Sequence, residues 1–388
     1  MRSFELSIPA MRLHSGAGSL QKVSAELRRL GCQRAVIFCG GSLSRHPTLL
    51  LELRNSLGNA YAGTFDRVRA HSPTDVVMEA AQMLRECGAD AAIAVGGGSA
   101  IVTARAASIV LAEGRTPREL CTVRGDDGRL TSPRLLAPKI PQLVVPSTPT
   151  TATPKAGTAV HDSVTGERLA MFDPKTRASC IFVDPALLAT APMELFRSAS
   201  LNAIAMAVSG LEADRESPMA VGLLRHALLL LAKWLPRLVS RADDAEARIQ
   251  LVHAAILCGQ GTDLTGGGIV TALGHSLGTK VDVDNGIVNA VLLRHTMQFN
   301  AKATGSRHAH VLSALQEAAG FQTAGTDAVG AMQSLLESID APTSLRAIGL
   351  GREIFDAVAT HAMMDWSLGN NPREVTHEAI LQVLEAAW

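Results

Sequence analysis

The stretch DAAIAVGGGS, residues 90–99, decides the fold, because a short apolar run ends there in three glycines. A buried parallel strand that enters a tight turn has this form. A second run of the same kind, RAVIFCGG, occupies residues 34–41, and residues 74–88 between them repeat apolar side chains at helical spacing. Together the three segments predict two parallel strands joined by a helix.

Two more apolar runs extend this unit into a larger sheet. They are PQLVVPSTPTT at residues 141–151 and SCIFVDP at residues 179–185. Beyond them the chain shows long helical periods, such as residues 219–235, and few strand-like runs. We therefore expect an α/β N-terminal domain over residues 1–185, with a mostly parallel, Rossmann-like sheet, and an all-α C-terminal domain over residues 186–388.

Charge and composition exclude several classes of protein. The chain has 36 Lys and Arg against 36 Asp and Glu, and only 3% aromatic residues, which argues against binding to nucleic acid. The six cysteines are scattered without a C-x-x-C pair, so we expect neither disulfides nor a thiolate metal site, and a cytoplasmic location. No uncharged apolar run reaches about 18 residues, so we expect a soluble protein without a membrane segment.

The glycines at the end of the first strand predict a phosphate site. Three glycines let the backbone approach a phosphate closely, and the N-terminus of the following helix offers free N–H groups. A nicotinamide dinucleotide would then contact Gly96, Gly97, Gly98 and Ser99. The alternative is an ordinary tight turn between a strand and a helix.

The exit of the strand at residues 34–41 bears on the form of the cofactor. NAD-selective sites usually carry an acidic side chain there, which binds the ribose 2′-hydroxyl. Here Gly40 and Gly41 occupy the place, followed by Ser42 and Arg45, so we expect NADP in preference to NAD. The alternative is that Arg45 is a solvated helix residue.

A third strand exit is rich in hydroxyl groups. It carries Ser147, Thr148 and Thr151, which we expect to contact the phosphates or the nicotinamide of the cofactor. The alternative is a plain turn, because Ser and Thr beside proline often form one.

These segments, in this order, resemble the iron-containing alcohol dehydrogenase family, whose superfamily includes dehydroquinate synthase and glycerol dehydrogenase. The resemblance spans nearly the whole chain and rests on GGGSAIVTAR, VPSTPTTA, CIFVDPALLATAP, GIVTALGHSLG, NGIVNAVLLRHTMQFN and NPRE. It implies a nucleotide-binding N-terminal domain, a helical C-terminal domain and hydride transfer in the cleft between them. It also implies a homodimer.

The positions that hold the family's metal carry other residues in this chain. The resemblance places an Asp and a His, four residues apart on one helix, at Asn202 and Met206, and two further His at Thr271 and Asn285. Amide, thioether and hydroxyl groups offer no anionic or imidazole ligand to Fe²⁺ or Zn²⁺. We therefore expect a site without metal.

One histidine of the family pattern remains. His275 follows Thr271 by four residues, and the resemblance places it beside the substrate. The alternative is a structural histidine paired with a backbone carbonyl. The resemblance also implies cofactor contacts for Ser72, within an HSP segment, and for Arg168, which replaces a lysine near the cofactor.

Within the family, maleylacetate reductases are most similar, on SLNAIAMAVSG at residues 200–210 and on the HSP segment. We expect NAD(P)H-dependent reduction of a maleylacetate-like keto acid or an aldehyde. Donors to the developing oxyanion would be His275, which also delivers the proton, with Asn202, Asn285 and Thr271. The substrate would contact Met206, and its carboxylate Lys155, Lys280 or Arg294, although each of these cations is alternatively a solvated surface charge.

Two other functions stay open. The chain is alternatively a catalytically inactive family member that acts as a binding or structural protein. It is alternatively a synthase-type enzyme in which nicotinamide is oxidised only transiently.

Overall fold

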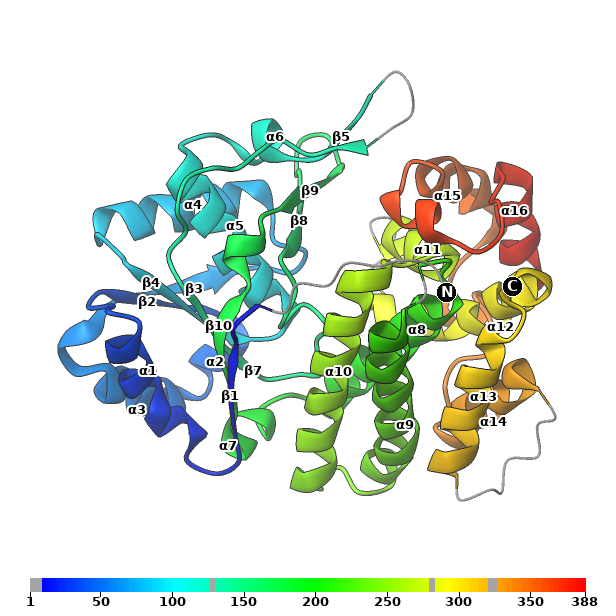
Figure 1. Ribbon diagram of the computed structural model, residues 1–388, viewed down its shortest axis with the longest axis horizontal. Helices are drawn as coiled ribbons and strands as arrows, with labels where there is room; N and C mark the ends of the chain where they lie inside the picture. The colour runs from blue at the N-terminus through cyan, green and yellow to red at the C-terminus, as the bar shows by residue number, and fades with distance from the viewer. Residues whose placement is uncertain (1–8, 126–129, 216, 279–282, 320–326) are drawn as a thin grey trace. The chain divides into compact units, whose positions relative to one another are not determined.

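The computed structural model describes residues 9–125, 130–215, 217–278, 283–319 and 327–388. The chain divides into two compact units, Met1–Ala191 and Pro192–Trp388, here called unit 1 and unit 2 (Figure 1). The division follows Ala191, whereas the sequence suggests a boundary after residue 185.

Unit 1 is built on a six-stranded sheet in the order β1-β10-β7-β4-β2-β3, with every neighbouring pair parallel. The prediction of a mostly parallel sheet is confirmed. The strands are β1 (Arg12–Ser15), β2 (Ala35–Gly40), β3 (Tyr61–Val68), β4 (Ala91–Gly96), β7 (Gln142–Pro146) and β10 (Ala178–Val183).

Helices cover both faces of this sheet, which explains why its central strands are continuous apolar runs. On one face α1 (Val23–Arg29) and α3 (Pro47–Leu57) pack against side chains such as Ile37 and Ile93. On the other lie α4 (Thr74–Glu86) and α5 (Gly98–Glu113) (Figure 1). Short elements complete the unit: η1 (Ser19–Lys22), α2 (Gly41–Ser44), η2 (Gly58–Ala60), α6 (Pro117–Leu120), β5 (Val123–Arg124), β6 (Leu130–Thr131), η3 (Pro174–Thr176) and α7 (Pro185–Leu188).

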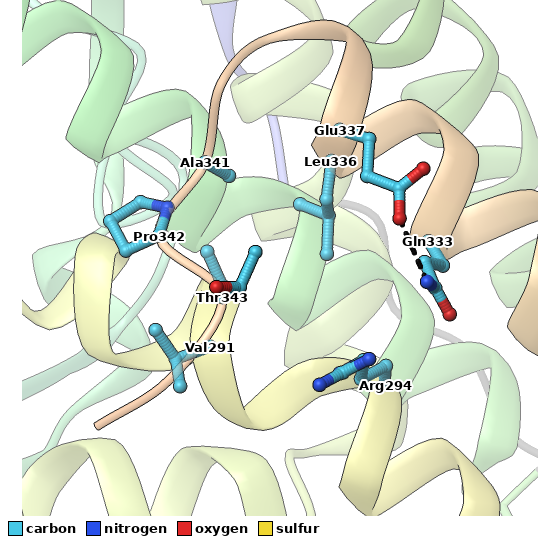
Figure 2. A pocket seen from close by; sticks show the side chains of 9 residues that line it. Val291, Arg294, Gln333, Leu336, Glu337, Ala341, Pro342 and Thr343 are labelled. Carbon is cyan, nitrogen blue, oxygen red and sulfur yellow. Dashed lines mark hydrogen bonds between the residues drawn. The ribbon is translucent and has the colours of Figure 1, made fainter. Parts of the chain in front are cut away.

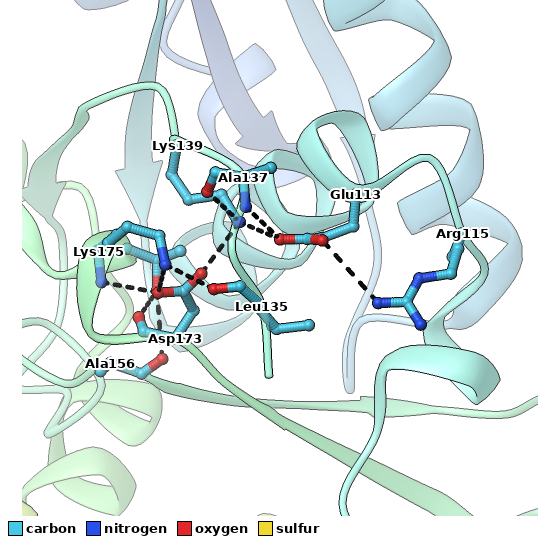
Figure 3. Close-up of polar contacts among 9 residues, drawn as sticks. Glu113, Arg115, Leu135, Ala137, Lys139, Ala156, Asp173 and Lys175 are labelled. Carbon is cyan, nitrogen blue, oxygen red and sulfur yellow. Dashed lines mark hydrogen bonds and ion pairs between the residues drawn. The ribbon is translucent and has the colours of Figure 1, made fainter. Parts of the chain in front are cut away.

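An antiparallel hairpin, β8 (Gly157–His161) and β9 (Arg168–Phe172), is fastened to α5 by a buried ion-pair network (Figure 3). The ammonium of Lys139, which has no exposed side-chain surface, lies 2.6 Å from Glu113 Oε1 and 3.0 Å from Asp173 Oδ2. Glu113 ends α5 and Asp173 directly follows β9. Removing one partner of a buried pair typically costs about 3–5 kcal/mol, so this network holds the base of the hairpin firmly.

The described residues of unit 2 form helices joined by loops and include no strand, as predicted. Its helices are α8 (Met193–Glu212), α9 (Pro218–Ser240), α10 (Ala245–Thr265), α11 (Ile269–Gly278), α12 (Asn285–Thr304), α13 (Arg307–Ala318), α14 (Ala328–Ser338), α15 (Phe355–Ala362) and α16 (His377–Ala386). Short 3₁₀ turns separate the last of them: η4 (Arg346–Ile348), η5 (Arg352–Ile354) and η6 (Trp366–Asn370).

Helix α9 is long and apolar enough to cross a membrane, the one such helix in the described part of the chain. Its Leu224, Leu228 and Leu231 are fully buried inside unit 2, and α8, α10 and α13 pack against it. A core helix of a folded domain has the same length and composition, and these contacts favour that interpretation.

Candidate active site

The predicted phosphate site lies where the order of the strands reverses. Strand β2 is followed in the chain by β3 on one side of it and then by β4 on the other, and ligands of open α/β sheets bind at such a point, outside the carboxyl ends of the strands. Strand β2 ends at Gly40 and β4 at Gly96, and Phe38 pairs with Ala94. Ser147, at the exit of β7, donates its N–H to Gly96 O, 2.9 Å away. The structure thus brings the three strand exits to one edge.

Close packing against hydroxyl groups explains the glycine run. Gly96 has a φ of +141°, a backbone conformation that residues other than glycine rarely adopt. A Cβ atom on Gly97 would lie 3.2 Å from Thr148 Oγ1, and one on Gly98 would lie 3.1 Å from Thr150 Oγ1. Because α5 begins at Gly98, its free N–H groups and these threonines meet in one place, which suits a phosphate.

Ser72 lies beneath the first turn of α5. Its hydroxyl donates to Ser99 O, 3.2 Å away, and accepts from Thr103 Oγ1 at 2.9 Å, while Ser72 O accepts from His161 N. Arg168 pairs with His161 across the hairpin and is half-buried. Ser72 therefore supports the glycine turn from within the protein, and Arg168 lies at the end of the same hairpin.

The exit of β2 carries a cation without an acidic partner among the described residues, Arg45, which is exposed and follows α2. Gly41 and Ser42 lie in α2 itself. The neighbouring strand β3 carries an acid, Asp66, close enough to act on β2. Burial, and secondly the negative charge of Asp66, raise the pKa of the Cys39 thiol to about 11. Asp66 is exposed on β3 and does not occupy the strand end at which NAD-selective sites place their acid.

A buried arginine fixes the loop that follows the hydroxyl-rich exit. Arg105 on α5 donates to Gly157 O at 2.8 Å and to Ala152 O at 2.9 Å, and no part of it is exposed. The loop between these carbonyls carries the half-buried Lys155, shortly after the buried Thr151. Arg105 thus holds both residues close to α5.

In unit 2, three of the four residues at the positions of the family's metal ligands, Asn202, Met206 and Thr271, hydrogen-bond to other neutral side chains. Thr271 Oγ1 on α11 donates to Met206 Sδ on α8, 3.3 Å away. Asn289 Nδ2 on α12, a residue that the sequence did not single out, donates to Asn202 Oδ1 at 2.9 Å. With its oxygen occupied in this way, the amide of Asn202 keeps its N–H₂ group as a donor.

Two asparagines fit α12 closely against α11. The Oδ1 atoms of Asn285 and Asn289 are buried without a hydrogen-bond partner among the described residues. A Cβ on Gly278 would lie 2.0 Å from Asn285 Oδ1, and one on Gly274 would lie 2.1 Å from Asn289 Oδ1. Each amide oxygen therefore points at the α-carbon hydrogen of a glycine, a weak C–H···O contact that only glycine permits at this distance.

His275 is paired with a carboxylate. Its Nδ1 lies 2.7 Å from Asp365 Oδ2, and 17% of the His275 side chain is exposed against 8% for Asp365. Burial by itself raises the pKa of Asp365, but the charge and hydrogen bond of His275 and the N–H of Ser367 hold it well below its usual range. The alternative prediction was a hydrogen bond to a backbone carbonyl, whereas Nδ1 of His275 pairs with the Asp365 carboxylate. Sequence reasoning missed Asp365, which lies 90 residues away in the chain.

The segment after Asp365 is fastened to the start of α11. Asn371 Oδ1 accepts from Ile269 N at 3.1 Å and from Asn300 Nδ2 at 3.2 Å. Asn300 also donates to the buried Glu212, at 2.9 Å. A Cβ on Gly268 would lie 2.9 Å from Asn371 Oδ1, so the glycines before α11 make room for this segment. The NPRE motif thereby fixes the helix that carries Thr271 and His275.

The donors present do not fit the family's metal. Among the residues that the structure describes, no three His, Cys, Asp or Glu side chains gather as a metal site. At the implied position stand two amides, one thioether and one hydroxyl, all neutral, whereas Fe²⁺ and Zn²⁺ are held by imidazole, thiolate or carboxylate.

The remaining predicted cations do not join these groups in the described structure. Lys280 lies outside the described residues. Arg294 lines a separate pocket of about 80 Å³ beside Thr343 and Pro342 (Figure 2). It follows Asn285 by nine residues on α12, two and a half turns, so the two side chains leave the helix on opposite sides.

Comparisons with known proteins agree along the whole chain. Residues 10–185 match the pattern described as iron-containing alcohol dehydrogenase, and residues 197–388 match the C-terminal pattern of that family. The chain is 31% identical to maleylacetate reductase 2 of Cupriavidus pinatubonensis, over 97% of this chain and 94% of that one. It is 28% identical to lactaldehyde reductase of Escherichia coli, over 96% and 97%. Its structure resembles that of maleylacetate reductase from Agrobacterium tumefaciens with a TM-score of 0.81, at 25% identity over 100% and 99%.

Proposed function

This chain belongs to the iron-containing alcohol dehydrogenase family and is an NAD(P)-dependent oxidoreductase, and we propose that it reduces a small carbonyl compound without a bound metal. The proposed substrate is a maleylacetate-like keto acid or an aldehyde, since relatives over the full length are named maleylacetate reductase and lactaldehyde reductase. The observation that carries the proposal is the pairing of His275 with Asp365 beside neutral residues at the positions of the metal ligands.

In the proposed reaction the NAD(P)H that the glycine turn before α5 would hold supplies the hydride that adds to the carbonyl carbon. The electron pair of the C=O bond moves to oxygen, which takes a proton from the His275 imidazolium, so that alcohol and NAD(P)⁺ form. The neutral imidazole regains a proton from solvent. The proposed reaction needs no Lewis acid. Its proton donor is His275, whose charged form the nearby carboxylate of Asp365 favours.

Charge on the developing oxyanion needs hydrogen-bond donors, each of which contributes about 3–4 kcal/mol when preorganised. Thr271 is one, because its hydroxyl donates to a thioether, a weak acceptor that a carbonyl oxygen readily replaces. The N–H₂ group of Asn202 is another, since Asn289 holds its oxygen. We assign Asn285 a supporting role, because its oxygen is turned toward Gly278.

NADP is the proposed form of the cofactor. The pyrophosphate is assigned to Gly96, Gly97, Gly98 and the N-terminus of α5, with Thr148 beside them. The exposed Arg45 after α2 is assigned to the ribose 2′-phosphate, because the strand end that usually carries an acid ends in glycine. Lys155 remains the candidate for a substrate carboxylate.

The test is NADPH oxidation by the purified protein with a panel of 2-oxo acids, 4-oxo acids and aldehydes. We expect turnover with at least one of them, and a loss of about 10²–10⁴ in kcat in His275→Asn with NADPH affinity unchanged. Binding of NADPH without turnover of any carbonyl compound would favour the non-catalytic alternative. Turnover without net NADPH consumption would favour the synthase alternative.

A further inference from the structure

Asp365 joins the imidazole of His275 to the start of a helical turn. Its Oδ2 lies 2.7 Å from His275 Nδ1, and its Oδ1 accepts the N–H of Ser367, 2.8 Å away, which caps η6. The ring of Trp366 packs on the imidazole with centroids 5.5 Å apart and a tilt of 44°. The backbone N–H of Ser367 thus fixes one oxygen of the Asp365 carboxylate. The imidazole of His275 is held between this carboxylate and the indole of Trp366.

This geometry determines which nitrogen carries which proton. A carboxylate whose pKa is held well below its usual range stays ionised and accepts, so Nδ1 of His275 donates to it. The proton that the ring exchanges is then the one on Nε2. A carboxylate 2.7 Å away also stabilises the imidazolium, because the two opposite charges are shielded from water in a mostly buried pair.

Among the described residues, the elements packed on α11 include one further histidine close to this pair. Helix α15 contributes His361, whose Nδ1 lies 3.1 Å from the hydroxyl of Ser276, the residue after His275. Helices α8 and α12 contribute neutral side chains near the site, namely Asn202, Met206, Asn285 and Asn289. Asp365 thus places a carboxylate directly against the imidazole of His275.

We propose that Asp365 is the positioning residue of the reaction: it holds His275 with Nδ1–H toward the carboxylate and favours the charged form of the ring, so that Nε2–H serves as the proton donor. The inference rests on the proposed reductase function. In this proposal Asp365, 90 residues from His275 in the chain, helps to control the charge at the reacting group, a task that a bound metal performs in metal-dependent enzymes.

The test is Asp365→Asn, with Asp356→Asn as the matched control. Asp356 also faces a histidine, His377, at 3.5 Å, but 84% of its side chain is exposed. The amide of Asp365→Asn still caps Ser367 through its oxygen, yet it turns a donor toward Nδ1 and imposes the other tautomer. We expect kcat at pH 7.5 to fall about 10²-fold, the KM for NADPH to stay within about twofold, and the alkaline limb of the kcat profile to move at least about one pH unit lower. Asp356→Asn should match the wild type.

Histidine ¹⁵N spectra decide the same point without turnover. His275, identified by its absence in His275→Asn, should show a protonated Nδ1 in the wild type and an unprotonated Nδ1 in Asp365→Asn. A wild-type ring with unprotonated Nδ1, or a pH profile of Asp365→Asn that superimposes on the wild type, would overturn the inference. A wild type that reduces no carbonyl compound while its spectra show the expected tautomers would overturn the proposed function and leave the pairing standing. If Asp365→Asn does not fold, the protonation state of Nδ1 in the wild-type spectra decides the question by itself.

Discussion

The hydroxyl of Thr271 donates a hydrogen bond to the sulfur of Met206, 3.3 Å away, at two positions where the family's metal would find histidines. A thioether is a weak acceptor, so this hydroxyl is a donor held in place without a strong partner. A carbonyl oxygen entering the site would take over the bond. We propose that these two positions present a hydrogen-bond donor to the substrate in place of a metal.

Thr271→Val removes this donor while keeping the shape of the side chain. We expect kcat to fall by about 10²-fold, because one oxyanion donor is lost, with little change in NADPH affinity. Thr296→Val is the matched control, since Thr296 is equally buried on α12 but donates to Leu293 O of its own helix. Steady-state kinetics of both variants make the comparison, and equal kcat values would show that Thr271 does not act on the oxyanion.

Gly96→Ala tests the phosphate site. Its φ of +141° strains any side chain, and the new Cβ would lie 3.2 Å from Ala100 Cβ, so the turn must shift. We expect the Kd for NADPH, measured by calorimetry, to rise at least about tenfold. Gly114→Ala places a similar strain, at a φ of +66°, on the other end of α5 with open space around it. It should lower stability and leave NADPH binding intact; equal losses of binding would count against the assigned site.

Arg45→Ala tests the form of the cofactor. Loss of a charge-assisted contact to the 2′-phosphate should weaken NADPH binding by about tenfold and leave NADH binding unchanged. Arg28→Ala serves as control, because Arg28 is likewise exposed and lies on α1. Tighter binding of NADH than of NADPH by the wild type would refute the assignment of Arg45.

Glu26→Gln tests a buried charge cluster of unit 1. Burial raises the pKa of Glu26, but hydrogen bonds from Arg29, His14 and Cys180 outweigh it and lower the pKa from 4.5 to about 2. A depressed carboxyl pKa stabilises the fold above the unfolded value, and this contribution is lost as the pH falls from about 4.5 to about 2. We expect Glu26→Gln to lower the Tm by about 4–8 °C at pH 7, for a cost of about 2 kcal/mol, and progressively less below pH 4.5.

The control for this prediction is Glu79→Gln, whose carboxylate is half exposed and pairs with Arg67 at 3.4 Å. Exposed pairs contribute little, so its Tm should follow the wild type at every pH. A difference between Glu26→Gln and the wild type that is constant from pH 7 to pH 3 would show that the charge of Glu26 does not stabilise the fold.

The central part of the sheet could be predicted from the sequence because its strands are buried on both faces. The apolar runs that become β2, β4, β7 and β10 end in glycine, proline or polar residues, and these endings mark the carboxyl edge. The edge strands β1 and β3 escaped prediction, since polar and exposed side chains such as Arg12, Ser15 and Asp66 interrupt them and leave no apolar run. Edge strands pair on one side only, so composition constrains them weakly.

The candidate site could be predicted only in part, because several of its contacts join residues that are far apart in the sequence. Motif spacing identifies Thr271 and His275 on one helix, but it carries no information on which distant carboxylate meets the imidazole. Asp365 and Asn371 bracket η6 and both reach α11, a relation that appears only once the helices are packed. The signal present in the sequence was Asp365 two residues before Ser367, the pattern of a capping aspartate.

Metal independence is tested most directly by NADPH oxidation with protein that has been stripped with EDTA, shown by elemental analysis to hold no metal, and then assayed with and without added Fe²⁺ or Zn²⁺. The neutral donors at Asn202, Met206, Thr271 and Asn285 predict full turnover in the stripped protein and no increase on adding either metal. Turnover that vanishes on stripping and returns with one of these metals would contradict a metal-free reaction.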